Sequence, residues 1–371
     1  MKGRERKMTR NQIWKIYGTD YKDMTVRLLE ATDLAGHIGD RHKCVGIKPN
    51  LVVASPAEYG GTTHPQVIAG IIEYLQANGF DNLLIAEGSW VGDRTKAAYE
   101  YCGYNALSRQ YGVPLVDTQK EKAHTIDCAG MKIAVTDVVD RIDFLINVPV
   151  MKGHCQTKMT CALKNLKGLL PNKEKSRFHT MGLHKPIAHL QAGIHQDFIV
   201  VDHICGDLDF EEGGNPVVCN TIMAGLDPVL IDSYVCSLMD YTPDDVPYVR
   251  YAEQLGIGST DIGSAEIVNI NEGEETELKA GRRLLEVSYA VDEVDSCSAC
   301  YGMLIGALCR LKDEGLLDKL DTKIGIGQGM RGKSGRLGVG RCTKDFDVCI
   351  MGCPPDEEKI YSELKRFIEN Q

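Results

Sequence analysis

The stretch HKCVGIKPNLVV, residues 42–53, is a short apolar run that ends in a polar loop. Such a run predicts a buried strand, and Pro49 and Asn50 predict the loop that leaves it. The strand would place Lys48 and Asn50 at its carboxyl end. The elements that follow along the chain decide what kind of sheet this strand joins.

Helices and strands alternate after this strand. The stretch THPQVIAGIIEYLQANGF (63–80) has helical spacing, with Thr63 as the expected N-cap and Asn78-Gly79 as the stop. Residues 95–112 predict another helix. Further strands are expected in DNLLIAEGS (81–89), VPLVDT (113–118) and RIDFLINVPVMK (141–152). The alternation predicts an α/β fold with a mostly parallel sheet and helices on both faces.

The carboxyl ends of parallel strands are where such sheets bind ligands. The polar residues expected there are Lys48, Asn50, Glu87, Ser89, Asp93, Lys152 and His154. They favour a binding pocket, with solvated loops as the alternative. The catalytic candidates are His154, Lys152, Glu87 and His64. The two histidines could transfer protons, because an imidazole titrates near neutral pH. His64 has a second interpretation, capping or packing at a helix start.

The middle of the chain is locally basic, although the net charge is −10. Residues 149–185 are rich in lysine and histidine, and TKMTCALKNLKGLL (157–170) predicts a helix. One interpretation is a solvated helix face followed by a lysine-rich loop. The other is a surface that binds carboxylate or phosphate groups. In the second, the residues that bind a small anionic substrate are Lys48, Asn50, Lys164, Asn165 and Lys333.

The length of 371 residues allows two domains. Residues 261–283 predict a polar connection, and we expect a domain boundary near residue 285. This gives an α/β core domain over 1–285 with the basic central segment, and a C-terminal cysteine-containing α/β region over 286–371. The negative net charge disfavours a nucleic-acid partner. No signal peptide or membrane-spanning run is expected, so we expect a cytoplasmic protein without a membrane partner.

Fourteen cysteines in a reducing compartment predict thiols rather than a disulfide framework. Cys297 and Cys300 form a C-x-x-C pair, a spacing at which two thiolates can bind one metal or cluster. Cys342 and Cys353 lie in later loops and complete a set of four. The set favours a 4Fe–4S cluster over structural zinc, and thiols without a ligand are the third interpretation. Such thiol richness also fits an anaerobe.

Two other cysteines, Cys309 and Cys349, lie in apolar runs and are expected in the core, although either could serve as a ligand. Between the cysteines, GQGMRGKS (327–334) matches the phosphate-loop pattern. That motif needs a helix directly after its Lys-Ser, and the glycines that follow make a poor helix. A nucleotide-hydrolysing P-loop protein is therefore not expected. We interpret the segment as a loop that presents Cys342, with Lys333 and backbone amides facing an anionic cluster or substrate.

The motifs KPNLV, FLINVPVMKGH, CALKNLKGLLP and GLDPVLID together resemble the family known as domain of unknown function 362, over roughly residues 40 to 240. The tail GIGQGMRGKSGRLGVGRCTKDFDVCIMGCPP is similar to the C-terminal region of some members. The resemblance implies an association with iron–sulfur clusters. This chain lacks the C-x-x-C-x-x-C-x-x-x-C-P run of the ferredoxin-type segment in those relatives, so a cluster here would use the sparser set of four cysteines.

The leading hypothesis is an anaerobic oxidoreductase or lyase with one 4Fe–4S cluster, a small anionic substrate and a redox partner protein. With three thiolate ligands the remaining iron could act as a Lewis acid, and with four, electron transfer is the natural role. One alternative is an electron-transfer or scaffold protein without its own substrate. Another is a zinc- or magnesium-dependent lyase or hydrolase that uses His154, His184 and Asp202, with structural cysteines.

Overall fold

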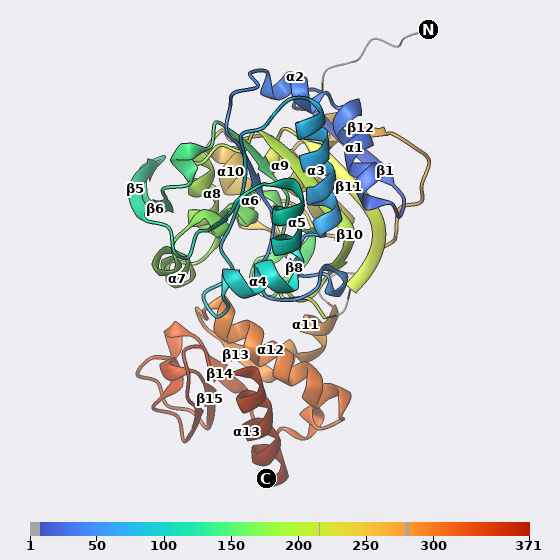
Figure 1. Cartoon of the computed structure of the whole chain (residues 1–371). Coiled ribbons are helices and arrows are strands. Elements are labelled where there is room, and N and C mark those ends of the chain that lie inside the picture. Colours follow the sequence, from blue (N-terminus) through green and yellow to red (C-terminus); the bar gives the residue numbers. More distant parts are fainter. Residues whose placement is uncertain (1–7, 215, 279–281) are drawn as a thin grey trace. The chain divides into compact units, whose positions relative to one another are not determined.

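Figure 1 shows the computed structural model of the chain, which describes residues 8–214, 216–278 and 282–371. The contacts divide the chain into two compact units, each with its own sheet. The first unit consists of residues 1–153 and 159–279, and the second consists of residues 154–158 and 280–371.

The first unit is built on an eight-stranded sheet with the order β12-β1-β11-β10-β7-β2-β3-β4. Its strands are β1 (Gln12–Tyr17), β2 (Val45–Lys48), β3 (Leu83–Glu87), β4 (Leu115–Asp117), β7 (Phe144–Asn147), β10 (Phe198–Asp207), β11 (Pro216–Gly225) and β12 (Glu266–Asn269). Strand β11 runs antiparallel to both neighbours, and the other five neighbouring pairs are parallel. The predicted mostly parallel sheet is confirmed.

The helices of the first unit form two groups (Figure 1). One group is α1 (Tyr21–Ala31), α2 (Leu34–Ile38), α3 (Pro65–Ala77), α4 (Thr95–Tyr101) and α5 (Tyr104–Tyr111). The other is α6 (Ala162–Asn165), α7 (Asn172–Thr180), α8 (His184–Gly193), α9 (Pro228–Leu238) and α10 (Pro247–Gln254). Short 3-10 turns are η1 (Ala57–Tyr59), η2 (Val139–Arg141), η3 (Leu166–Leu169) and η4 (Ile262–Ser264). Two ladders lie outside the large sheet, β5 (Ala123–Cys128) with β6 (Met131–Thr136), and β8 (Lys152–His154) with β9 (Lys158–Thr160).

Both faces of the large sheet are buried. Ile47, Ile85 and Ile146 share one apolar cluster with residues of α1, α3 and α5. Leu145 and Val201 are buried outside that cluster, because successive side chains of a strand point to opposite faces. The predicted helices on both faces are therefore confirmed, and the polar strand ends lie between these two apolar layers.

The second unit is also α/β. A parallel four-stranded sheet has the order β13-β14-β15-β16. Its elements are α11 (Arg282–Val287), η5 (Ser288–Ala290), β13 (Val291–Glu293), α12 (Ser298–Asp313), η6 (Leu317–Lys319), β14 (Ile324–Ile326), η7 (Gln328–Met330), β15 (Leu337–Val339), η8 (Arg341–Thr343), β16 (Val348–Ile350) and α13 (Glu357–Glu369). Cys309 is buried in α12, as predicted, whereas Cys349 in β16 is only half-buried.

The boundaries of several elements differ from those that the sequence predicts. The N-cap position of α3 is His64 rather than Thr63, whose hydroxyl instead donates to Val148 O at 2.9 Å. The single helix expected over residues 95–112 is interrupted at Gly103, which has φ of 80° and separates α4 from α5. Glycine adopts this left-handed conformation without the strain that a Cβ would add.

Tertiary contacts explain the larger differences. The helix expected over 157–170 begins instead as β9, which pairs with β8. The connection expected over 261–283 contains β12, which gains a parallel partner in β1 at the sheet edge. Strand pairing overrides local helix or loop preference in both cases, with the nearby β8 for β9 and the distant β1 for β12.

Candidate functional site

Buried lysines gather near the carboxyl ends of the strands in the first unit. The group consists of Lys48, Lys152, Lys164, Lys167 and Lys175, and we call it the lysine cluster. Lys48 and Lys152 are 0% exposed, and Lys167 is half-buried. Lysines are almost never fully buried unless their amino groups are paired. The contacts of each amino group therefore decide what the cluster can do.

The first contact pairs Lys48 at the end of β2 with Glu87 at the end of the neighbouring strand β3. Lys48 Nζ lies 2.7 Å from Glu87 Oε2 and also donates to Pro49 O at 2.7 Å. Glu87 Oε2 accepts from Leu51 N at 3.0 Å. Burial lowers the pKa of Lys48, and the charge of Glu87 opposes that effect. The pair thus fixes the loop that leaves β2.

The backbone of η3 passes directly over this ion pair at Gly168. A Cβ on Gly168 would lie 2.0 Å from Glu87 Oε1 and 2.6 Å from Lys48 Nζ, so only glycine fits. Thr118 Oγ1 donates to Gly168 O at 2.7 Å and holds the turn in place. Lys175 Nζ donates to Gly88 O at 2.7 Å, beside the same pair.

Lys152 stabilises backbone on the other side of the cluster. Its Nζ donates to Asn50 Oδ1 at 3.1 Å, to Gly61 O at 2.5 Å and to Glu211 O at 2.7 Å. These three acceptors use all three protons of an ammonium group. Burial lowers the pKa of Lys152 to about 8. Lys152 therefore orders the loops around the cluster rather than presenting a proton to a ligand.

Lys164 and Lys167, three residues apart, have fewer such contacts. Lys164 Nζ pairs with Glu211 and lies 3.0 Å from Thr160 Oγ1. Lys167 Nζ lies 3.4 Å from His179 Nε2. Burial, followed by the charge of Lys164, lowers the pKa of Lys167 to about 7. This amino group changes its charge near neutral pH.

A carboxyl group beside these lysines also titrates near neutral pH. Burial, followed by the charge of Glu211, raises the pKa of Glu212 to about 7. Lys152 and Lys164 lower it and so limit the shift. The cluster therefore contains one acid and one base that can each gain or lose a proton near pH 7.

A chain of amide side chains orients Asn165. Asn165 Oδ1 lies 3.4 Å from Lys48 Nζ, and its Nδ2 donates to Asn147 Oδ1 at 2.7 Å. Asn147 in turn donates to Gln196 Oε1 at 2.6 Å, and Gln196 donates to Gln191 Oε1 at 2.8 Å. Each buried amide thus has a partner, which fixes the rotamer of Asn165 beside the lysine cluster.

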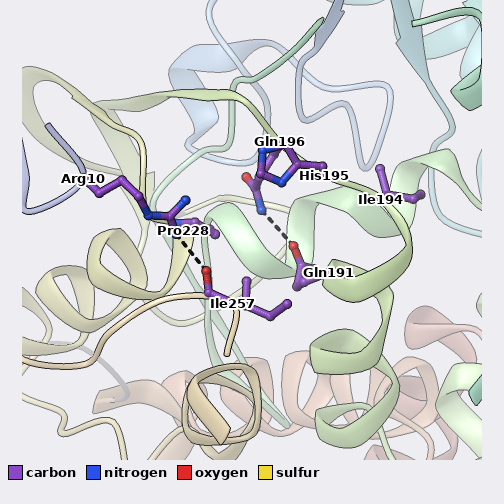
Figure 2. A pocket seen from close by; sticks show the side chains of 7 residues that line it. All are labelled: Arg10, Gln191, Ile194, His195, Gln196, Pro228 and Ile257. Carbon is purple, nitrogen blue, oxygen red and sulfur yellow. Dashed lines mark hydrogen bonds between the residues drawn. The ribbon is translucent and has the colours of Figure 1, made fainter. Parts of the chain in front are cut away.

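The last two amides of that chain also line a surface hollow (Figure 2). Its lining residues are Arg10, Gln191, Ile194, His195, Gln196, Pro228 and Ile257. None of the residues that the sequence singles out as catalytic or substrate-binding is among them. Arg10 donates to Ile257 O at 2.8 Å across the hollow, so its guanidinium group is already engaged.

The two predicted catalytic histidines lie in different units. His64 in the first unit pairs with Asp202, with Nδ1 2.9 Å from Oδ2. His154 belongs to the second unit, where its Nδ1 accepts from Gln156 N at 3.1 Å and Thr157 N at 3.0 Å. Because Nδ1 accepts, a neutral His154 carries its proton on Nε2.

The four predicted metal ligands lie in three segments of the second unit. Cys297 is the N-cap of α12, and Cys300 lies in its first turn. Cys342 lies in η8, and Cys353 precedes α13. Burial, followed by the charges of Cys297, Cys353 and Cys342, raises the pKa of Cys300 to about 12. The sulfur of Cys300 thus lies near the other three cysteines of the predicted set.

The spacing of these sulfurs is wider than a closed zinc site requires. Tetrahedral bonds of about 2.3 Å to zinc place the sulfurs about 3.8 Å apart. Among the residues that the structure describes, the group whose ligand atoms all lie within 4.8 Å of one another is His124, Asp137 and Asp140, and no three cysteines form such a group.

The segment that matches the phosphate-loop pattern supplies hydrogen-bond donors to two of these sulfurs. Gln328 Nε2 lies 3.6 Å from Cys297 Sγ, and Arg331 Nε lies 3.4 Å from Cys342 Sγ. Strand β15 follows the segment, no helix begins at the described residue Lys333, and Lys333 is exposed. Cationic and amide donors toward sulfur suit an anionic thiolate-bound cluster.

The structure brings the predicted residues Lys48, Glu87 and Asn165 together. Sequence reasoning misses several neighbours of the predicted sites. Glu211 and Glu212 lie in an acidic run that reads as a plain turn, and its position just after a strand was the available signal. The contacts of Gln328 and Arg331 with Cys297 and Cys342 follow from the tertiary structure, and the only sequence signal was that the glycine-rich loop lies between cysteines.

No helix in the described part of the chain is long and apolar enough to cross a membrane. One curated relative, the thylakoid-associated protein sll1697 of Synechocystis, is 24% identical over 233 residues, which cover 60% of this chain and 70% of that protein. The lactate racemase apoprotein of Thermoanaerobacterium thermosaccharolyticum aligns over 63% of this chain and 59% of its own, with 13% identity and a TM-score of 0.42. The model of the family described as domain of unknown function (DUF362) matches residues 45–237. The chain therefore belongs to the DUF362 family, as its motifs predict.

Proposed function

We propose that the chain is a cytoplasmic enzyme that binds a small carboxylate or phosphate compound at the lysine cluster and carries a 4Fe–4S cluster in its second unit. The observation that carries the substrate assignment is that four buried lysines and the half-buried Lys167 lie around the carboxylates of Glu87, Glu211 and Glu212. Added negative charge would improve that balance. Membership of the DUF362 family and the α/β fold are consistent with an enzyme-like role.

Within the cluster, the lysines divide between support and ligand binding. Lys48 and Lys152 hold loops through the hydrogen bonds described above, together with Asn50. Lys164 and Lys167 would bind the anion, because their amino groups make fewer contacts with the backbone. An anion beside Lys167 would favour its protonated form. Glu212 would exchange a proton with the substrate, since its pKa lies near 7.

Calorimetric titration with sulfate, phosphate and a small dicarboxylate tests this assignment. We expect Lys164→Met to weaken binding by roughly tenfold or more, since it removes a buried charge beside the ligand. Lys173→Met is the matched control, because Lys173 is exposed on α7 and should leave affinity unchanged. Equal affinity in both variants would rule out the lysine cluster as the anion site.

In the second unit, the ligands would be Cys297, Cys300, Cys342 and Cys353. A cluster bound by four sulfurs supplies one-electron transfer, which supports an oxidoreductase with a redox partner protein over a lyase. Gln328 and Arg331 would orient and partly neutralise Cys297 and Cys342 through the donors described above.

Free thiols are consistent with a reducing compartment such as the cytoplasm. No disulfide bond joins cysteines within the described residues. Thiols persist where glutathione and thioredoxin keep them reduced.

A further inference from the structure

Three side chains that take no part in binding the anion meet on one side of β10. His64 Nδ1 lies 2.9 Å from Asp202 Oδ2, and His64 Nε2 lies 3.9 Å from Cys205 Sγ. The exposed fractions of His64, Asp202 and Cys205 are 3%, 0% and 3%. A thiol, an imidazole and a carboxylate in this order form the arrangement that activates cysteine nucleophiles on unrelated folds.

Asp202 and Cys205 contact the same histidine beside a β-bulge. The two residues are three positions apart, so in a regular strand their side chains would point to opposite faces. The pairing of β10 with β11 shifts register between His203 and Cys205, and the extra residue lies in β11, because His203 pairs with Thr221 and Cys205 pairs with Val218. Bulges disrupt the ladder locally and are common next to active sites.

The imidazole of His64 is held in one orientation. Asp202 Oδ2 also accepts from His64 N at 2.7 Å, and Asp202 Oδ1 accepts from Ile204 N at 3.1 Å. The ring of Tyr21 packs edge-on against His64, with centroids 5.4 Å apart. Burial lowers the pKa of His64, but the charge of Asp202 and the hydrogen bond to it outweigh burial and raise it to about 10. With Nδ1 held by Asp202, Nε2 faces the sulfur of Cys205 at 3.9 Å.

We propose that Cys205 is a nucleophile, that His64 exchanges its proton, and that this centre takes a small ester or thioester. The sulfur reacts as the thiolate of an ion pair with protonated His64. It forms a bond to the acyl carbon, the bond from that carbon to the leaving alkoxide or thiolate breaks, and the leaving group takes the proton of His64. Water then adds to the acyl carbon and gives a proton to His64, the acyl–sulfur bond breaks, and a carboxylic acid leaves while the ion pair is restored. Asp202 is a positioning residue.

The choice of an acyl compound rests on the proposed function. Its product is a carboxylate, the class of anion proposed for the lysine cluster. Lys152 Nζ donates to Gly61 O at 2.5 Å, and Gly61 is three residues from His64 along the chain. In the structure, Cys205 Sγ donates to Ala57 O at 3.3 Å, so η1 covers the sulfur and must move aside for a substrate.

Acetylation of the wild-type protein by p-nitrophenyl acetate, followed residue by residue by mass spectrometry, tests the proposal without a variant. Cys219 on the neighbouring strand β11 is the internal control, since it is 7% exposed and burial raises its pKa to about 11. We expect Cys205 to react roughly tenfold faster or more, because His64 lies beside its sulfur and activates it. If Cys219 reacts as fast or faster, exposure alone decides reactivity, and the proposal is wrong.

The variant Asp202→Asn separates positioning from folding. We expect acetylation of Cys205 to slow to the rate of Cys219, while the rate at Cys219 stays unchanged. A rise at both cysteines would show that Asp202 only holds the fold, which contradicts its positioning role. Sulfate calorimetry on Cys205→Ser checks the lysine cluster separately. Retained sulfate affinity in this variant shows that the two proposals concern different sites, and lost affinity would show that they share one.

Discussion

The lysine cluster of the first unit and the four cysteines of the second balance their charges in opposite ways. Lys48 and Lys164 each have a carboxylate partner, in Glu87 and Glu211. Around Cys300, burial and three neighbouring cysteines all raise the pKa of its thiol. A site of opposite charges can be stable before any ligand arrives. A site of like sulfur groups is stabilised when a metal or cluster neutralises the thiolates.

The largest effect should come from removing a cysteine of the set of four. We expect Cys353→Ala to lose essentially all bound iron, because three sulfurs leave one coordination position without its thiolate. Iron analysis after anaerobic purification measures this. The matched control is Cys309→Ala, a buried cysteine of α12 outside the set, which should keep the wild-type iron content. Full iron in Cys353→Ala would remove that residue from the ligand set.

The next largest effect concerns the buried ion pair of Lys48 and Glu87. Lys48→Met leaves the carboxylate of Glu87 buried without its partner, and removing one member of a buried pair costs about 3–5 kcal/mol. Urea unfolding measures the free energy of unfolding. Adding Glu87→Gln should recover most of the loss, because the neutral amide no longer needs a cation. A loss below about 1 kcal/mol in the single variant would show that the pair does not balance a buried charge.

The binding of sulfate should weaken as pH rises. In the free protein the pKa of Lys167 is about 7, and those of Lys152 and Lys175 are about 8. A bound anion raises these values, so binding takes up protons and is strongest below about pH 7. Above that pH Glu212 also loses its proton and repels the anion. Affinity should fall by at most about tenfold per pH unit for each coupled proton.

Calorimetry in buffers with different heats of ionisation would measure the proton uptake directly. Sulfate is the suitable probe because its own charge stays constant from about pH 6 to pH 9. An affinity that is flat over this range would show that the lysines with lowered pKa are not at the binding site.

The smallest effect should come from Arg331, which is exposed and lies 3.4 Å from Cys342 Sγ through its Nε. We expect Arg331→Gln to lower the reduction potential of the bound cluster, because a nearby positive charge favours the more negative reduced form. The shift should be less than about 59 mV, a tenfold change for one electron. Lys333→Gln, in the same exposed loop, is the control and should shift the potential less. An equal shift would point to a general effect of surface charge.

Local sequence predicted the sheet well because its strands are continuous apolar runs, such as Val45–Lys48 and Phe144–Asn147. Their polar ends brought Lys48 and Glu87 together, since neighbouring parallel strands end at the same edge. It failed where strand pairing decides the conformation, as in β9 and β12. The sequence of a segment does not indicate whether another segment of the chain will pair with it as a strand.

The relay of His64, Asp202 and Cys205 could not be read from the sequence for a related reason. Regular alternation places Asp202 and Cys205 on opposite faces, so the strand pattern alone does not bring both residues to His64. The glycines that follow Ser334 indicate that the phosphate-loop match is not a nucleotide site. The sequence does not show that Gln328 and Arg331 donate to Cys297 and Cys342, because these contacts depend on the tertiary structure.

We propose that the sulfur site is completed by an iron–sulfur cluster, whereas the ion pairs of Lys48 and Lys164 in the lysine cluster form without a ligand. Anaerobic purification followed by iron, sulfide and zinc analysis with a visible absorption spectrum tests it most directly. We predict a coloured protein with about four iron and four sulfide ions per chain. A colourless protein with one zinc ion per chain would contradict the account.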